Sequence, residues 1–335
     1  MTSESSNCVG QGICGGAAQI ALAALLSLLC TAAPADDVVL SCLHDQPPEA
    51  ALLTHALQPW ADEVAVESGG TLRIAWKASS GAELWRAFDV GEAPCLLAPP
   101  EPGKWDAALL GLPFIAPPSS ERASRGGWDA MASGILPLDP TLQPLAVVVE
   151  APLPLLAIGA APPMPQAMSG ATVAVPNAPS GVPLEALGVR VQVTPPAEAA
   201  RRLSSGAVDF AVLPRALAPP GLVEVALDTD RALAGRPLVL GVARAWLEVL
   251  TPAQRASLMA GNPRRLSARA GRALDRAEDV ARASAPSGSV LWPEAQMTRL
   301  RDAGAAAQRN AAAALPDGRA RLSALRAALD EAEAR

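Results

Sequence analysis

The chain has 335 residues, half of them hydrophobic, which is enough to form one large core or two smaller ones. A formal net charge of -6 argues against a nucleic-acid-binding protein, because contacts with phosphates require a basic face. The sequence contains two histidines and no cluster of Cys and His residues, so it gives no support for a metal centre.

The first 35 residues are typical of a signal peptide. Ala17–Ala33 is an apolar run of helix formers, and Ala33-Pro34-Ala35 suits cleavage by signal peptidase, which would leave Asp36 first. The run is short for a transmembrane helix, and no second run of this kind follows it. We therefore expect a soluble chain exported to the periplasm, with a lipid anchor on Cys30 as the alternative.

The first part of the mature chain alternates strand and helix patterns. The expected elements are a strand (Val38–Leu43), an amphipathic helix (Glu49–Glu67), a strand (Leu72–Trp76), a turn (Ser79-Ser80-Gly81) and helices over Glu83–Phe88 and Arg122–Met131. The long helix is expected to end at Gly69-Gly70.

The segment Leu145–Ile158 is almost continuously apolar, and Glu150 is its only charge. Pro152 and Pro154 exclude a helix, because proline lacks an N–H donor and clashes with the preceding turn. The pattern therefore predicts one long, buried strand that crosses the molecule.

Gly170–Pro214 has the pattern of a complete β-loop-α-β-α-β unit. Its expected strands are Thr172–Val175, Val189–Val193 and Val208–Leu213, and its expected helices run through Leu184–Leu187 and Ala197–Leu203. Such alternation indicates a parallel sheet, whose ligand sites lie outside the carboxyl ends of the strands. The expected loop Pro176–Gly181 therefore lies where ligands usually bind.

The last third of the chain is expected to be mainly helical. A strand (Pro237–Val242) and a helix (Arg244–Leu250) precede helices over Ala253–Ala260 and Leu266–Ala283, a short strand (Val290–Trp292), and helices over Pro293–Ala314 and Asp317–Glu333. Thr251-Pro252 supplies an N-cap and a proline in the first turn of the first of these late helices. The sequence thus predicts two lobes rich in β-α-β units, followed by a helical tail.

Several short motifs occur in a fixed order along most of the mature chain. They are Leu112-Pro113-Phe114, the strand Gly170–Pro176, Leu187-Gly188 with Val193, Ser205–Asp209, and Leu238–Leu250 with Trp246 before Thr251-Pro252. In that order they resemble the motifs LPF, G-x-K-I-R-V-P, LG-x-x-P/V-V, GxVD and V-x-x-x-x-W-x-x-L-P. These motifs are typical of the solute-binding subunits of tripartite ATP-independent periplasmic (TRAP) transporters, of the dicarboxylate-receptor type.

The resemblance implies an α/β, two-lobe periplasmic-binding-protein fold, similar to type II. Each lobe would be a mostly parallel sheet flanked by helices, with long crossing strands and a long helix bracing both lobes. The expected boundaries are 36–148 plus about 237–265 for lobe I, 149–236 for lobe II, and 266–335 for C-terminal helices that pack across both lobes.

The resemblance also implies a function. Members of this family capture a small organic acid between the lobes by hinge closure and deliver it to the permease subunits in the membrane. We expect a monomer without a cofactor. The sequence has no G-x-S-x-G elbow, P-loop or G-x-G-x-x-G motif opening a helix after a strand, so we do not expect an enzyme.

Two positions depart from the family pattern. Ala174 stands where the family has an arginine that pairs with the solute's carboxylate, and Phe210–Pro214 replaces a strand that ends in Gln/Glu-Asn-Pro. A receptor without this clamp would anchor a carboxylate differently or bind a less acidic solute. The alternative is an orphan or sensor-input binding protein with the same fold.

The candidate ligand-binding residues come from the loops that the family presents to its solute. They are Ser79, Ser80, Trp105, Asn177, Ser180 and Arg215. Arg215 is the best replacement for the missing cation, with a surface arginine as its alternative role. The serines and the asparagine are also ordinary turn formers, and a tryptophan also fills cores.

Cys42 and Cys95 remain in the chain after cleavage of the leader. In the fold implied by the resemblance, they lie on neighbouring strands. Export would permit a disulfide between them, and two buried free thiols are the alternative.

Overall fold

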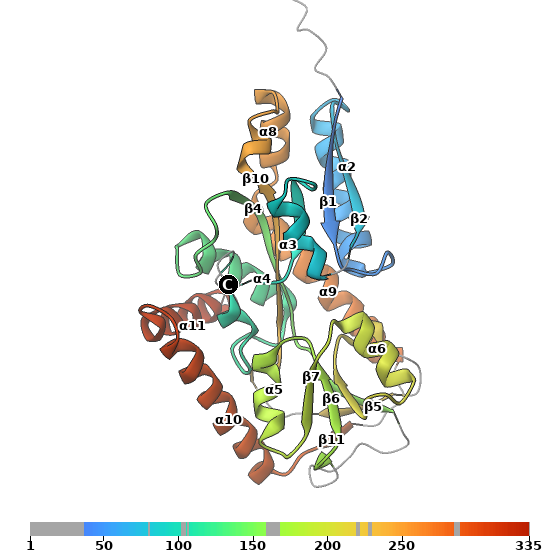
Figure 1. Cartoon of the computed structure of the whole chain (residues 1–335), viewed down its shortest axis with the longest axis vertical. Helices are drawn as coiled ribbons and strands as arrows, with labels where there is room; N and C mark the ends of the chain where they lie inside the picture. Colours follow the sequence, from blue (N-terminus) through green and yellow to red (C-terminus); the bar gives the residue numbers. More distant parts are fainter. Residues whose placement is uncertain are drawn as a thin grey trace, which may run out of the picture. The chain divides into compact units, whose positions relative to one another are not determined.

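Two mixed β-sheets, each flanked by helices, form the framework of the two lobes (Figure 1). The computed structural model describes residues 37–79, 81–101, 105, 107–158, 168–218, 222–226, 230–284 and 289–334. The expected signal peptide, with Cys30, lies outside the described residues. Among those that are described, no helix is both long enough and apolar enough to cross a membrane.

The sheet of the first lobe has the strand order β2-β1-β3-β10-β4. Its strands are β1 (Val38–His44), β2 (Leu72–Ala78), β3 (Cys95–Ala98), β4 (Leu142–Glu150) and β10 (Arg236–Ala243). β1 runs parallel to β2 and β3, whereas β10 runs antiparallel to both β3 and β4. The three strands at one side therefore end at a common edge.

The sheet of the second lobe has the order β11-β9-β5-β8-β6-β7. Its strands are β5 (Leu155–Ile158), β6 (Thr172–Val175), β7 (Arg190–Val193), β8 (Phe210–Val212), β9 (Leu222–Ala226) and β11 (Ser289–Leu291). β6 is parallel to β7 and β8, and β11 is parallel to β9, whereas β5 is antiparallel to β8 and β9. The expected β-α-β-α-β unit thus supplies the three parallel strands β6, β7 and β8 of this sheet.

Helices cover the sheets, and the last three, α9 to α11, together extend along both lobes (Figure 1). The helices in the described part of the chain are η1 (Leu53–Leu57), α2 (Gln58–Glu67), α3 (Gly81–Asp89), η2 (Ala108–Gly111), α4 (Ser120–Ala132), α5 (Ala178–Glu185), α6 (Pro196–Ser204), η4 (Arg215–Leu217), α7 (Arg244–Leu247), α8 (Pro252–Ala260), α9 (Pro263–Ser284), α10 (Glu294–Ala313) and α11 (Gly318–Ala334).

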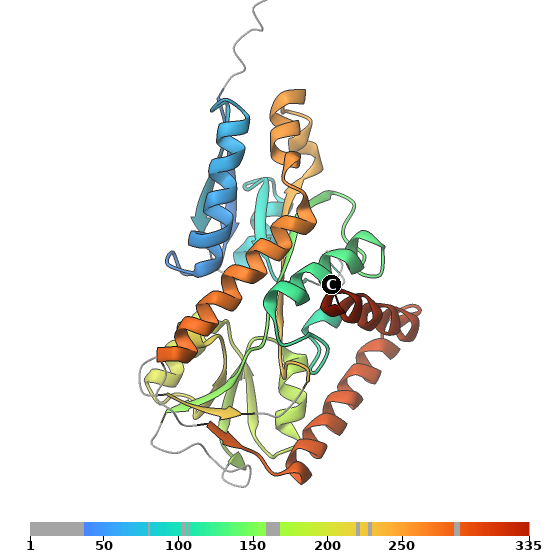
Figure 2. The same ribbon diagram turned by 180° about the vertical axis from the view of Figure 1, so that it is seen from behind.

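Helix α9 braces both lobes. It packs against α4, β4 and η1 of the first lobe and against η4 of the second, and Figure 2 shows it running diagonally across the molecule. The crossing with α4 is close at Gly271, where an added Cβ would lie 2.3 Å from the backbone oxygen of Ser120. Glycine at this position therefore allows the two helix backbones to touch.

The prediction of a single strand over Leu145–Ile158 is wrong, because the segment forms β4 in one sheet and β5 in the other. The two prolines interrupt the strand, since neither can donate to a β-ladder. Between them, Leu153 N–H donates to the carbonyl of Ala234, which leads back into β10. The chain therefore passes between the lobes in two segments that are hydrogen-bonded to each other.

The prediction of a loop through Pro176–Gly181 is wrong after Asn177, where α5 begins. Asn177 has extended backbone angles, and its side-chain oxygen accepts a hydrogen bond from Ser180 N–H, so it is the N-cap of the helix. Pro179 is compatible with the first turn because the N–H groups there have no partner within the helix.

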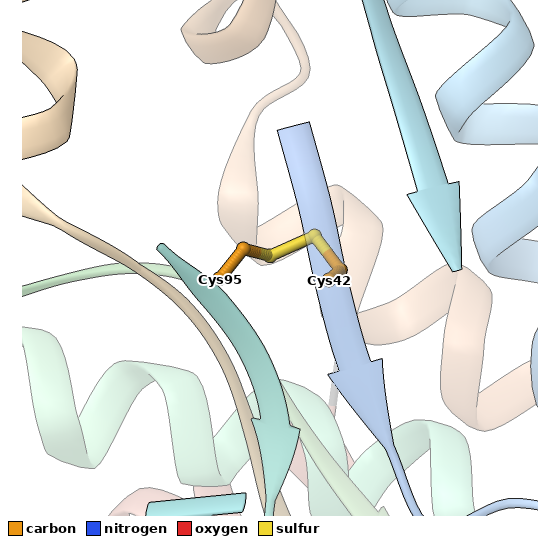
Figure 3. The surroundings of a disulfide bond; sticks show 2 residues. All are labelled: Cys42 and Cys95. Atoms are coloured by element: carbon orange, nitrogen blue, oxygen red, sulfur yellow. A yellow bond between two sulfur atoms is a disulfide. The ribbon is translucent and has the colours of Figure 1, made fainter. Parts of the chain in front are cut away.

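A disulfide joins Cys42 of β1 to Cys95 of β3 (Figure 3). The two residues are register partners on parallel strands, and both are fully buried. The bond therefore fixes β3 against β1 in the middle of the first sheet.

Candidate functional site

The parallel strands of the first sheet end together at His44 and Ala78. Ser79, the next residue after β2, donates its N–H to the carbonyl of His44 at 2.8 Å and continues this edge. The His44 ring is buried, and its Nδ1 atom has no hydrogen-bond partner among the described residues. Burial lowers the pKa of His44, against the opposing effects of the Gln46 backbone and the Asp45 carboxylate, and so favours the neutral ring.

An arginine and two carboxylates meet at this edge. Arg236 Nη2 lies 2.5 Å from Asp45 Oδ2, and its Nη1 lies 3.1 Å from Glu150 Oε2. Arg236 and Glu150 are cross-strand partners on β10 and β4, whereas Asp45 lies in the loop after β1. All three side chains are at most 10% exposed, so the cluster is nearly closed to solvent.

The cluster has one cation for two acids. Burial raises the pKa of the Glu150 carboxyl, and the Asp45 charge adds to that effect, while the Arg236 guanidinium opposes it. A buried negative charge without a matching cation is costly. The carboxylates of Asp45 and Glu150 therefore compete for the single guanidinium of Arg236.

Asn177 and Ser180 are brought together as the sequence predicts, but their side chains serve to cap α5. Ser180 donates both its N–H and its hydroxyl to Asn177 Oδ1, at 3.0 and 2.7 Å, and Ser180 is fully buried. The other end of the amide points to the crossing segment, since Asn177 Nδ2 donates to the carbonyl of Gly235 at 3.1 Å. Asn177 thus ties the second lobe to the residue before Arg236.

Arg215, the expected replacement cation, has two carboxylate partners. It forms an ion pair with Glu224 of β9 and a second, of 3.0 Å, with Glu278 of α9. Glu278 Oε1 also accepts the N–H of Ala216, and burial raises the pKa of Glu278 despite Arg215. Arg215 therefore joins the second lobe to the bracing helix in this structure.

Trp105 is 1% exposed and packs in the core of the first lobe, so its ring is not accessible to a solute in this structure. Ser79 is half-buried at the sheet edge, and Ser80 lies outside the described residues. Ala174 and Leu213, at positions where the resemblance implies polar groups, are both fully buried beneath α6.

The sequence interpretation missed Asp45 and Arg236 as members of a site. The signal was Glu150, a single charge in an apolar strand, because a buried carboxylate requires a cationic or hydrogen-bonding partner. Arg236 opens the next apolar strand of the same sheet, and pairing of the two strands places the charges opposite each other.

A hollow of about 340 Å³ lies away from this edge, between α10, α11 and residues 114–115 and 230–231. Its arginines are Arg231, Arg301 and Arg326. They are paired with Asp330, Glu294 and Gln308 respectively. Within the described ranges, no group of three or more His, Cys, Asp or Glu residues is arranged to hold a metal ion.

No protein-family model matches the chain, and no curated protein matches it. Solved structures do match its fold. One is a TRAP solute-binding protein from a marine metagenome, specific for aromatic acids and crystallised with 3-hydroxybenzoate, with 19% identity and a TM-score of 0.77. The match covers 89% of this chain and 99% of the other.

Two further solved structures are similar to the same extent. The TRAP periplasmic solute-binding protein of Bordetella bronchiseptica with bound mandelate is 18% identical, with a TM-score of 0.75 over 88% of this chain and 99% of its own. The TRAP solute-binding protein of Rhodoferax ferrireducens with copurified benzoate is 20% identical, with a TM-score of 0.75 over 89% and 99%. The chain therefore has the two-lobe fold of the TRAP periplasmic solute-binding proteins.

Proposed function

We propose that this chain is the periplasmic solute-binding receptor of a TRAP-type transporter. The proposal rests on the fold, which matches 99% of the length of each of two solved TRAP solute-binding proteins. The partners of this receptor would be a small solute and the permease subunits in the membrane.

The two crossing segments suit a receptor that closes around its ligand. They join the lobes through β4 to β5 and through residues 230–236 into β10, with Leu153 N–H bonded to Ala234 between them. A ligand that contacts both lobes stabilises the closed state by the difference between its affinities for the closed and open states. This role requires binding and hinge bending and no chemical step.

The solute class that we propose is small organic acids, with aromatic acids first. The three solved structures hold 3-hydroxybenzoate, mandelate and benzoate, each of which presents one carboxylate on a small ring-bearing body. A pocket closed between two lobes can bury such a body almost completely.

A thermal-shift screen tests the proposal. The purified protein would be heated with benzoate, 3-hydroxybenzoate, mandelate and succinate, and with benzamide and benzylamine as neutral and cationic controls. We expect at least one acid to raise the melting temperature in proportion to the logarithm of its concentration. Stabilisation by the amine or the amide, and by none of the acids, would overturn the acid class while keeping a receptor.

A further inference from the structure

We propose that Arg236 is the cation that binds the carboxylate of the solute, and that Asp45 occupies this guanidinium until the solute replaces it. This inference rests on the proposed function and names the anchor of its site. The sequence offers no arginine at the position of Ala174, so the question is which buried cation lies at the junction of the lobes.

The position of Arg236 fits this role. Its neighbour Gly235 accepts the hydrogen bond from Asn177 at the start of α5 in the second lobe. A Cβ built on Gly111 would lie 3.2 Å from Asn177 Nδ2 and 3.5 Å from Pro237 Cδ, so the residues on both sides of Arg236 lie close to that helix N-terminus. On the side of the first lobe, Arg236 reaches the loop that follows β1. Arg236 therefore lies between the end of β1 and the start of α5.

The guanidinium still has binding capacity. The described hydrogen bonds use one nitrogen for Asp45 and another for Glu150, each with a single carboxylate oxygen. An arginine can instead grip one carboxylate through two parallel hydrogen bonds, which are stronger and more directional than a single contact. A solute carboxylate that binds in this way would displace a partner held by one oxygen.

Of the two acids, Asp45 is the one that can move. Glu150 is fixed opposite Arg236 by the pairing of β4 and β10. Asp45 lies in the loop after β1, and its other described hydrogen bond comes from its sequence neighbour, Gln46 Nε2, at 3.0 Å. Rotation of this one loop side chain would therefore free the guanidinium without disturbing the sheet.

The charge balance of the cluster favours a solute carboxylate that replaces Asp45 at Arg236 over one that binds in addition to both acids. With Arg236 between Asp45 and Glu150, a third carboxylate would add a second uncompensated negative charge to a site that is nearly closed to solvent. Replacing the carboxylate of Asp45 with that of the solute leaves the buried charge unchanged. Asp45 thus acts as an internal competitor, and it lowers the apparent affinity by the fraction of molecules in which it holds Arg236.

Arg215 is less suited to this role, although it also pairs with two acids. Both partners are fixed on regular elements, Glu224 on β9 and Glu278 on α9. Glu278 is held further by the N–H of Ala216. Freeing Arg215 would break an ion pair between the second lobe and the bracing helix.

The test compares two pairs of substitutions by calorimetric titration of the whole protein with the aromatic acids named above. We expect Arg236→Gln to weaken binding at least about 30-fold, because a charge-assisted, two-bond contact is lost. We expect Asp45→Asn to tighten binding about 10-fold, because the competitor is removed. The matched controls are Arg264→Gln and Asp129→Asn, which break a two-bond ion pair elsewhere in the first lobe and should leave affinity unchanged.

If the Arg236→Gln protein binds the aromatic acids with the affinity of the wild type, the inference is overturned and the receptor function remains intact. Weaker binding by Asp45→Asn at unchanged stability would also overturn the inference. If Arg236→Gln does not fold, the Asp45→Asn protein still tests the inference. A cationic anchor predicts that the preference for benzoate over benzamide is larger in Asp45→Asn than in the wild type. If neither the wild type nor Asp45→Asn binds any acid, the anchor and the acid class fail together.

Discussion

Asn177 donates a hydrogen bond of 3.1 Å to the carbonyl of Gly235 while its side-chain oxygen caps helix α5. One amide thus fixes the start of a helix in the second lobe and holds the crossing segment that enters β10. This relationship explains why a residue in a predicted ligand loop is half-buried and bonded to the crossing segment.

Substituting Asn177 separates these two roles. We expect Asn177→Ala to lower the free energy of unfolding by about 2 kcal/mol, because the two hydrogen bonds from Ser180 at the cap and the bond to Gly235 are lost together. Asn177→Ser keeps a capping oxygen and should cost about half as much. Urea unfolding measures both. Thr251→Ala, which removes only the cap of α8, is the control, and an equal loss for Asn177→Ala and Thr251→Ala would contradict the second role.

The crossing of α9 over α4 depends on the absence of a side chain at Gly271. A Cβ there would lie 2.3 Å from the oxygen of Ser120, which belongs to the backbone and cannot move away alone. We expect Gly271→Ala to destabilise the protein by about 1–3 kcal/mol, despite the better helix propensity of alanine. Ser284→Ala, at the exposed end of the same helix, should change stability by less than about 0.5 kcal/mol. A more stable Gly271→Ala protein would show that the helices are farther apart than described.

The disulfide between Cys42 and Cys95 closes a loop with a sequence separation of 53 residues. Replacing both cysteines with alanine should lower the free energy of unfolding by about 2–5 kcal/mol, chiefly because the unfolded chain regains freedom. The comparison is made by urea unfolding of the oxidised wild type, the reduced wild type and the double variant. We expect the last two to agree, and an unchanged midpoint after reduction would indicate that the bond does not form.

The buried acids predict the direction of the pH dependence of stability. The folded-state pKa of Glu150 is raised above its ordinary value of 4.5, so the folded protein keeps a proton that the unfolded chain has released. This contribution is fully present below about pH 4.5 and is lost as the pH rises through the folded-state pKa. Glu278 contributes in the same direction.

We therefore expect Glu150→Gln to reduce the loss of stability that occurs above pH 4.5, as measured by urea midpoints across that range. Glu121→Gln is the control. The hydrogen bond from Arg272 lowers the pKa of Glu121. The contribution of Glu121 to stability therefore changes only at pH values below its ordinary pKa of 4.5. Identical pH profiles for the wild type and Glu150→Gln would contradict a raised pKa at that residue.

Much of the fold could be predicted from the sequence. The strands and helices of Gly170–Pro214 follow from periods of two and of three to four residues in the hydrophobic pattern, which depend on local sequence alone. The break between β4 and β5 was harder, since an apolar run with prolines is compatible with one crossing strand or with two. The difference depends on which sheet pairs with each half, and that is a long-range property.

The candidate site was less predictable, because its members are far apart in the sequence. Arg236 and Glu150 meet through strand pairing, and Asp45 reaches them from the end of another strand. Arg215 shows the opposite case, since its position after β8 suggested a ligand contact, but Glu224 and Glu278 pair with it in the folded chain. A local motif identifies a loop, whereas the partner of a charge is determined by tertiary structure.

Small-angle X-ray scattering with and without a saturating acid from the thermal-shift screen would detect closure of the two lobes in solution. A receptor that closes two lobes around its solute must become smaller on binding. We expect a lower radius of gyration in the presence of the acid and no change with benzamide. An unchanged radius of gyration with an acid that calorimetry shows to be bound would contradict capture by hinge closure.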